Sequence, residues 1–184
     1  VSKLDRYVFQ KVRSYISGRY EKGLEVVPVS MNLSWMDFYD EALIDEIVDF
    51  LEHPEFPSEL IRFEITETSY AALEENVGKV LNKIKKKGAW ILLDDFGSGY
   101  SSFNMLQRFS FDILKIDMSF TREIEMNSRT RRLIPLIIET AHALDAKTVA
   151  EGAETKEQVE FLRNHGCDYI CLLYTSPSPR DGLL

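Results

Sequence analysis

Polar side chains stand at the end of one apolar segment after another along this chain. They are Asn32, Glu64 with Glu67, Asp94 with Asp95, Lys115 with Asp117, and Glu151 with Glu154. A single acid in such a place usually caps the next helix, but five consecutive segments ending this way are harder to explain by capping alone. Carboxylates that converge on one place repel one another unless a cation binds between them. The pattern therefore predicts a cation site.

The predicted ligand atoms are carboxylate oxygens and one amide oxygen. These hard donors favour Mg²⁺ or Mn²⁺ over zinc. The three histidines lie on predicted helices or beside a proline, where surface or packing roles are expected, and the two cysteines have no other metal ligand beside them. The adjacent Asp94 and Asp95 suit a site for two metal ions, because one of the two carboxylates can bridge the pair.

Strand geometry decides which of these side chains can meet. Successive strand residues point to opposite faces, so Asp94 and Asp95 can serve one site only if the strand ends there. The following Phe96-Gly97-Ser98-Gly99 predicts that it does. If the strand ends at this point, the second aspartate need not point to the face opposite the first.

The same alternation separates the two glutamates after the preceding strand. Glu64 and Glu67 are an odd number of residues apart, so we expect Glu64 at the metal and Glu67 on the rim. Lys115 and Asp117 are expected to share a face. A lysine beside a metal cluster can orient water or neutralise phosphate charge.

Strand-like and helix-like segments alternate along the whole chain. The predicted strands are 24–33, 61–66, 90–93, 113–116, 148–150 and one that begins at 167–170; the predicted helices are 4–16, 43–51, 73–84, 102–108, 128–144 and 155–162. This alternation indicates a parallel α/β fold. Polar residues at the ends of many strands favour a TIM-type (β/α)8 barrel over an open doubly wound sheet, because barrel enzymes keep their chemistry there.

Composition narrows the class of protein. Apolar residues make up 45% of the 184, enough for a buried core, and 30 acidic residues against 22 Lys and Arg make the chain acidic. An acidic chain argues against binding to a nucleic-acid polymer, which normally uses a basic surface. We find no signal peptide and no apolar run of about 18 residues, and expect a cytoplasmic domain.

Five strings of residues resemble successive motifs of the EAL domain family, in the order of that family. They are Val29 to Ser34, Phe63 to Glu67, Asp94 to Ser102, Leu114 to Asp117 and Ala150 to Glu154. The resemblance covers residues 1–170. It implies an incomplete TIM-type (β/α)8 barrel with one antiparallel strand. It also implies Mg²⁺- or Mn²⁺-dependent hydrolysis of cyclic di-GMP to linear pGpG.

The resemblance also assigns roles to the polar residues above. It places two metal ions on Asn32, Glu64, Asp94, Asp95 and Glu151. The implied catalytic residues are Lys115, which positions the attacking water, Asp117, which supports Lys115, and Glu151, which binds a metal or its water. Glu67 would anchor the loop from Phe96 to Ser102, and Glu154 would be a structural or substrate-side acid.

Both ends of the chain depart from the family pattern. The Glu-Ala-Leu motif lies upstream of a segment like Leu4-Asp5, so it is not contained here, and Glu41-Ala42-Leu43 falls on a helix and does not replace it. Residues 171–184 look like translated sequencing adapter, the alternative being a natural linker rich in Pro and Ser. We therefore expect the 184-residue chain alone to be unstable and inactive.

Two further functions stay open beside the enzyme. One is a catalytically inactive sensor that binds cyclic di-GMP, and the other is a scaffold that serves only protein contacts. The family resemblance implies a homodimer of the complete domain, with upstream GGDEF or sensor domains and a membrane anchor as features of a longer parent protein.

Overall fold

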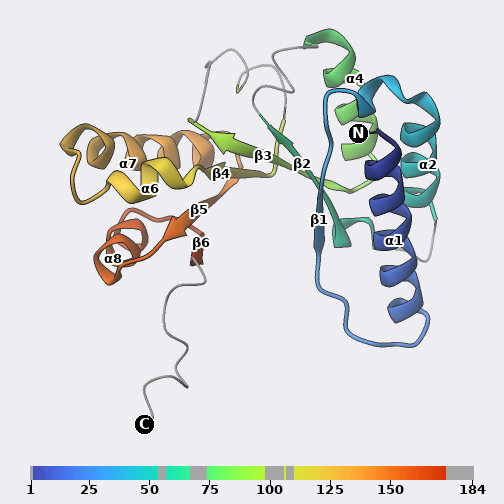
Figure 1. The fold of residues 1–184 in the computed structure, drawn as a ribbon, viewed down its shortest axis with the longest axis horizontal. Coiled ribbons are helices and arrows are strands. Elements are labelled where there is room, and N and C mark those ends of the chain that lie inside the picture. Colours follow the sequence, from blue (N-terminus) through green and yellow to red (C-terminus); the bar gives the residue numbers. More distant parts are fainter. Residues whose placement is uncertain (1, 54–56, 67–73, 98–105, 107–109, 173–184) are drawn as a thin grey trace. The chain divides into compact units, whose positions relative to one another are not determined.

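A computed structural model describes residues 2–53, 57–66, 74–97, 106 and 110–172. Six strands form one sheet in which the spatial order of the strands is their order in the chain (Figure 1). The strands are β1 (Val29–Asn32), β2 (Ile61–Thr66), β3 (Trp90–Phe96), β4 (Ile113–Ile116), β5 (Lys147–Ala153) and β6 (Tyr169–Leu172). The chain divides into two units, Val1–Leu93 with Ser102–Phe111, and Asp94–Ser101 with Asp112–Leu184.

The first unit packs helices against β1, β2 and the start of β3. Its described helices are α1 (Ser2–Tyr20), α2 (Glu41–Leu51) and α4 (Glu74–Lys85), with short 3₁₀ turns at Asp37–Tyr39 and Ser58–Leu60. Strand β2 alternates buried and half-buried residues, so that Phe63 and Ile65 face the core while Glu64 lies on the opposite face. Helices α1 and α2 run side by side, joined by Phe9 and Phe50, whose rings meet edge to face at 5.9 Å (Figure 1).

The second unit contains the end of β3 and strands β4 to β6. Its helices are α6 (Met118–Glu123), α7 (Ser128–Ala143) and α8 (Lys156–Asn164). Strands β4 and β5 pair in parallel, as do β5 and β6. Buried Ile134, Ile138 and Leu162 form part of its core. The predicted helix 155–162 is confirmed as α8, and a capping box stabilises its start, because Thr155 and Gln158 each bind the backbone of the other.

Most predicted elements are confirmed. The three strand pairs with a described register are all parallel, and the antiparallel strand implied by the resemblance is not among them. The short helix α6 was not predicted, and the predicted helix 128–144 is confirmed as α7, which contains Pro135. The predicted helix 102–108 and the tail 173–184 lie outside the described residues, so the boundary at residue 170 stays a prediction. No helix in the described ranges is long and apolar enough to cross a bilayer.

A buried carboxyl group fixes the segment that follows β1. Asp37 is fully buried, and its Oδ2 accepts hydrogen bonds of 2.7 Å from both the backbone N–H and the hydroxyl of Ser34. The Ser34 hydroxyl also lies 3.5 Å from Asp5 Oδ2 of α1. Burial first, and the neighbouring Asp37 second, raise the pKa of Asp5. The two acids therefore link α1 to the loop after β1 best when Asp5 carries a proton.

The raised pKa of Asp5 predicts how stability depends on pH. Protonated Asp5 contributes fully to stability below the pKa of the unfolded state, about 3.9. This contribution is lost as the pH rises through the higher pKa of Asp5 in the folded state. We expect Asp5→Asn to raise the melting temperature of the full-length protein at pH 7 by at most about 2 °C, because solvent screens much of the repulsion at a carboxyl group this accessible. Thermal unfolding followed by circular dichroism from pH 4 to 8 measures this.

The control is Glu25→Gln, which changes an exposed carboxylate in the loop before β1. It should leave the melting temperature unchanged over the same pH range. A melting temperature of Asp5→Asn that falls below that of the parent at pH 7 would contradict the assignment of repulsion to Asp5 and Asp37.

Candidate functional site

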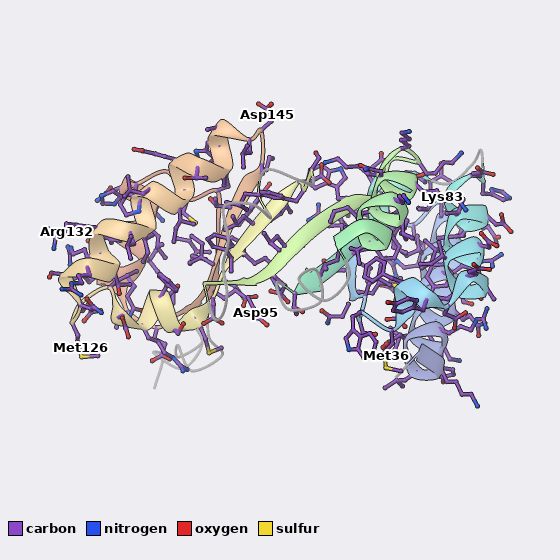
Figure 2. The ribbon with its side chains drawn as sticks, turned by 90° about the horizontal axis from the view of Figure 1, so that it is seen from above. Met36, Lys83, Asp95, Met126, Arg132 and Asp145 are labelled. Atoms are coloured by element: carbon purple, nitrogen blue, oxygen red, sulfur yellow. The ribbon has the colours of Figure 1, made fainter. Side chains whose placement is uncertain are left out.

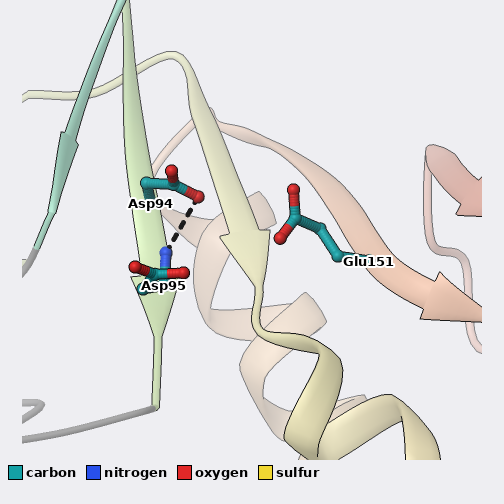
Figure 3. Close-up of side chains that lie close together, drawn as sticks. All are labelled: Asp94, Asp95 and Glu151. Carbon is teal, nitrogen blue, oxygen red and sulfur yellow. Dashed lines mark hydrogen bonds between the residues drawn. The ribbon is translucent and has the colours of Figure 1, made fainter. Parts of the chain in front are cut away.

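Three carboxylates of the second unit converge on one point. An oxygen of each of Asp94, Asp95 and Glu151 lies within 4.8 Å of the others, and all three side chains are half-buried. Asp94 and Glu151 extend toward one another from β3 and β5 (Figure 3). Three of the acids that the sequence predicts to share a site therefore lie together in this unit.

An unusual backbone conformation allows two neighbouring aspartates to serve one site. Asp95 has a φ of +55°, in the left-handed region that aspartate tolerates better than most residues. Its N–H donates a 3.0 Å hydrogen bond to Asp94 Oδ1 (Figure 3). The prediction that the strand ends at this point is wrong, because β3 continues through Phe96. The left-handed turn at Asp95, inside the strand, replaces the strand end as the cause.

A second irregularity accompanies the third carboxylate. The pairing of β5 with β6 shifts register between Ala150 and Ala153, and Gly152 within that interval has a φ of +70°. Such bulges redirect side chains at the ends of strands and often lie beside functional sites. Glu151 therefore leaves β5 from a bulge, as Asp95 leaves β3 from a turn.

The ammonium group of Lys115 lies between two of the carboxylates. Its Nζ is 2.7 Å from Asp94 Oδ1 and 2.9 Å from Glu151 Oε1, and its side chain is only 13% exposed. Limited solvent strengthens these ion pairs compared with pairs on an open surface. Among the described residues, Lys115 is thus a cationic partner of the group of three acids, through Asp94 and Glu151. This oxygen-only donor set fits a divalent cation such as Mg²⁺ or Mn²⁺, which Asp94, Asp95 and Glu151 could hold.

Two other predicted site residues have structural partners. Asp117 caps α6, since its carboxylate accepts hydrogen bonds from the backbone N–H and hydroxyl of Ser119. Glu154 forms an ion pair of 3.2 Å with Arg122 of α6. Both contacts attach α6 to segments that carry site residues, because Asp117 follows Lys115 by two positions and Glu154 follows Glu151 by three.

The first unit brings together another predicted pair. Asn32 of β1 is the register partner of Glu64 of β2, and the N–H of Leu33 donates a 2.9 Å hydrogen bond to the carbonyl of Glu64. Asn32 is exposed and Glu64 half-buried. Glu67 lies outside the described residues. The predicted site residues thus form two described groups, Asn32 with Glu64 in one unit and Asp94, Asp95, Lys115 and Glu151 in the other.

Sequence reasoning missed the contact that supports the end of β3. Gly97 has a φ of +99°, and a Cβ placed there would lie 2.3 Å from Cε2 of Phe120 in α6. In addition, the N–H of Asp117 donates a 3.4 Å hydrogen bond to the carbonyl of Phe96. The start of α6 therefore packs directly on the turn after Asp95. A glycine followed about twenty residues later by an aromatic carries no recognisable signal of this contact.

Comparison with known proteins gives consistent matches. The family model of the EAL domain matches residues 1–177. The cyclic di-GMP phosphodiesterase NbdA of Pseudomonas aeruginosa is 30% identical over 180 residues, which are 97% of this chain and 23% of that protein. The bifunctional diguanylate cyclase/cyclic di-GMP phosphodiesterase MucR of the same species is 35% identical over 158 residues, 85% of this chain and 23% of that protein.

A solved structure agrees with the fold. The EAL domain of DcpA from Mycobacterium smegmatis has a TM-score of 0.78 and 28% identity, covering 89% of this chain and 74% of that chain. The predicted fold class, an incomplete TIM-type α/β barrel, is confirmed by this match. The chain spans about a quarter of the length of NbdA and MucR, so those proteins contain long regions with no counterpart here.

The contact between Gly97 and Phe120 predicts a cost of adding one methyl group. We expect Gly97→Ala to lower the free energy of unfolding by about 1–3 kcal/mol, because the methyl group collides with the ring and alanine disfavours a positive φ. Chemical denaturation measures the loss. Adding Phe120→Ala should recover the part that comes from the collision.

Gly78→Ala is the matched control, since Gly78 lies within helix α4 with no atom within 4 Å of its added Cβ. It should be neutral or stabilising by up to about 1 kcal/mol. Equal effects of the two substitutions would show that Phe120 does not restrict Gly97.

Proposed function

Because this chain belongs to the EAL domain family, we propose that its complete domain hydrolyses one phosphodiester bond of cyclic di-GMP to give linear pGpG. The names of two relatives at 30% and 35% identity support this substrate and reaction. The observation that carries the proposal is the group of Asp94, Asp95 and Glu151 with Lys115 among them. A pure scaffold has no use for such a group.

The chemistry of the proposed reaction depends on divalent metal ions, Mg²⁺ or Mn²⁺, at the carboxylates. Bound ions would lower the pKa of an attacking water and neutralise charge on the scissile phosphate. Asp94, Asp95 and Glu151 would hold them, with Asn32 and Glu64 as the further ligands that the family pattern implies. The convergence of three carboxylate oxygens within 4.8 Å supports this assignment.

Lys115 is the proposed catalytic cation. Its ammonium group already lies within 2.9 Å of two site carboxylates, where it can donate a hydrogen bond to the attacking water and hold that water in line with the phosphorus. Asp117 acts on it indirectly, by capping the helix that follows. Glu154 has a structural role through Arg122, and the role of Glu67 as a loop anchor is retained as part of the proposal.

The runner-up is a domain that binds cyclic di-GMP without cleaving it. The Glu-Ala-Leu glutamate that would complete the ligand set is not in this chain, and its absence from the parent domain would favour this second function.

We further propose a cytoplasmic location and a homodimer of the complete domain. Light scattering tests the homodimer. A diguanylate cyclase domain in the parent protein is supported by the bifunctional relative MucR.

The first test is hydrolysis of cyclic di-GMP by the full-length protein that carries this chain. Product analysis by chromatography should show pGpG in Mg²⁺ or Mn²⁺, and excess chelator should abolish turnover because the carboxylates alone cannot activate water. Cyclic di-GMP that binds but stays intact in both metals would favour the sensor. The same assay on the isolated 184 residues tests the expectation that they are inactive alone.

The second test concerns Lys115. We expect Lys115→Ala to lower kcat by about 10²–10³-fold while cyclic di-GMP still binds, because the ammonium acts on charge that develops during the reaction. Lys147→Ala is the matched control, since Lys147 lies exposed at the opposite end of the neighbouring strand β5, and it should keep full turnover. Unchanged kcat in Lys115→Ala would remove this lysine from the mechanism.

A further inference from the structure

Three large side chains stand exposed on the segment directly after β1. Trp35 is 49% exposed, Met36 40% and Tyr39 57%. Figure 2 shows Met36 at the periphery of its unit. Single exposed apolar residues are common on proteins, but Trp35 and Tyr39 also contact one another, so their rings form one exposed aromatic patch.

The backbone that carries these side chains is held firmly. The N–H of Leu33 bonds to the carbonyl of Glu64, and Ser34 bonds twice to the buried carboxylate of Asp37. The side chains of Leu33 and Phe38 are 2% and 5% exposed, so they point into the core from the same segment. The outward position of Trp35 and Tyr39 is therefore imposed by buried anchors, which makes the pair a preorganised surface.

The two rings leave aromatic faces open to solvent. Trp35 and Tyr39 meet edge to face, with centroids 6.4 Å apart and planes at 88°. In this arrangement only one ring face is used by the pair. A flat aromatic ligand can stack on a face that remains open, and base–aromatic stacking is worth about 1–3 kcal/mol per base.

Local charge indicates which part of a nucleotide would lie there. The segment from Leu33 to Glu41 has three acidic residues, Asp37, Asp40 and Glu41, and neither lysine nor arginine. Asp37 is buried against Ser34 and Asp40 caps α2, so Glu41 is the exposed carboxylate of this segment. A segment with an exposed acid and no lysine or arginine of its own suits an uncharged base better than a phosphate group. Guanine, in addition, presents N–H donors on its Watson–Crick edge, which an exposed carboxylate such as that of Glu41 accepts well.

We propose that Trp35, together with Tyr39, forms a stacking subsite for one guanine base of cyclic di-GMP. The inference rests on the proposed function, which supplies the ligand. Asn32 at the end of β1 precedes Trp35 by only three residues, and loops after the ends of parallel strands are where barrel enzymes bind their ligands. Asn32 and Glu64, two of the proposed metal ligands, lie in the same unit as Trp35. A phosphate held beside them would allow a base of the same molecule to reach the segment after β1.

Calorimetric titration of the full-length protein with cyclic di-GMP tests the subsite, in a Lys115→Ala background that prevents turnover. Trp35→Ala should raise Kd about 5- to 150-fold, the range that corresponds to the stacking energy above. Trp35→Phe should keep Kd within about threefold, because phenylalanine retains a ring face. Tyr15→Ala is the control: Tyr15 is 53% exposed and lies ten residues, about 15 Å of helix, from Asp5 at the anchored end of α1.

Fluorescence supplies a readout that a loss of folding cannot imitate. Cyclic di-GMP should quench a tryptophan signal in the Lys115→Ala parent, and that component should be absent in Trp35→Phe. A Kd of Trp35→Ala within about twofold of the parent, or a quench that persists in Trp35→Phe, would overturn the subsite and leave the proposed function intact. Failure of the parent itself to bind cyclic di-GMP would refute both.

Discussion

The repulsion among three carboxylates is the constraint around which the second unit is organised. Asp94, Asp95 and Glu151 come within 4.8 Å of one another, and such a group is stable only with compensating positive charge. Lys115 supplies part of it from β4, the strand between the two that carry the acids. The helix that follows Lys115 then attaches to both neighbours, through Phe120 at Gly97 and through Arg122 at Glu154.

Regular strands alone could not produce this arrangement. A strand sends neighbouring residues to opposite faces, so Asp95 reaches the site only through its left-handed backbone, and Glu151 emerges where β5 loses register with β6. Each irregularity uses a residue that tolerates a positive φ at low cost, an aspartate in one case and Gly152 in the other. The irregular positions in these two strands are thus part of how the site is built.

The sequence was sufficient to predict the alternation of strands and helices and the acids at the strand ends, because burial patterns and helix caps are local signals. Thr155 with Gln158 is an example, since both partners of the capping box lie in one turn. The turn at Asp95 could not be predicted, because a positive φ at an aspartate has no local sequence signal. The contact of Gly97 with Phe120 could not be predicted either, because its partners lie more than twenty residues apart. Asp117 shows how one residue can carry two signals: an acid after a strand is expected to cap the next helix, and it does, but the same residue also matches a motif.

The order of the strands has a consequence for how the chain can fold while it is being synthesised. Each strand of the sheet lies beside the strands that precede and follow it in the sequence, so every new strand can pair with one already synthesised. Pairing of strands that are neighbours in the sequence keeps contact separations smaller than pairing of distant strands would, and smaller separations favour faster folding. A chain leaving the ribosome can therefore extend its sheet strand by strand, without waiting for a distant segment to be translated.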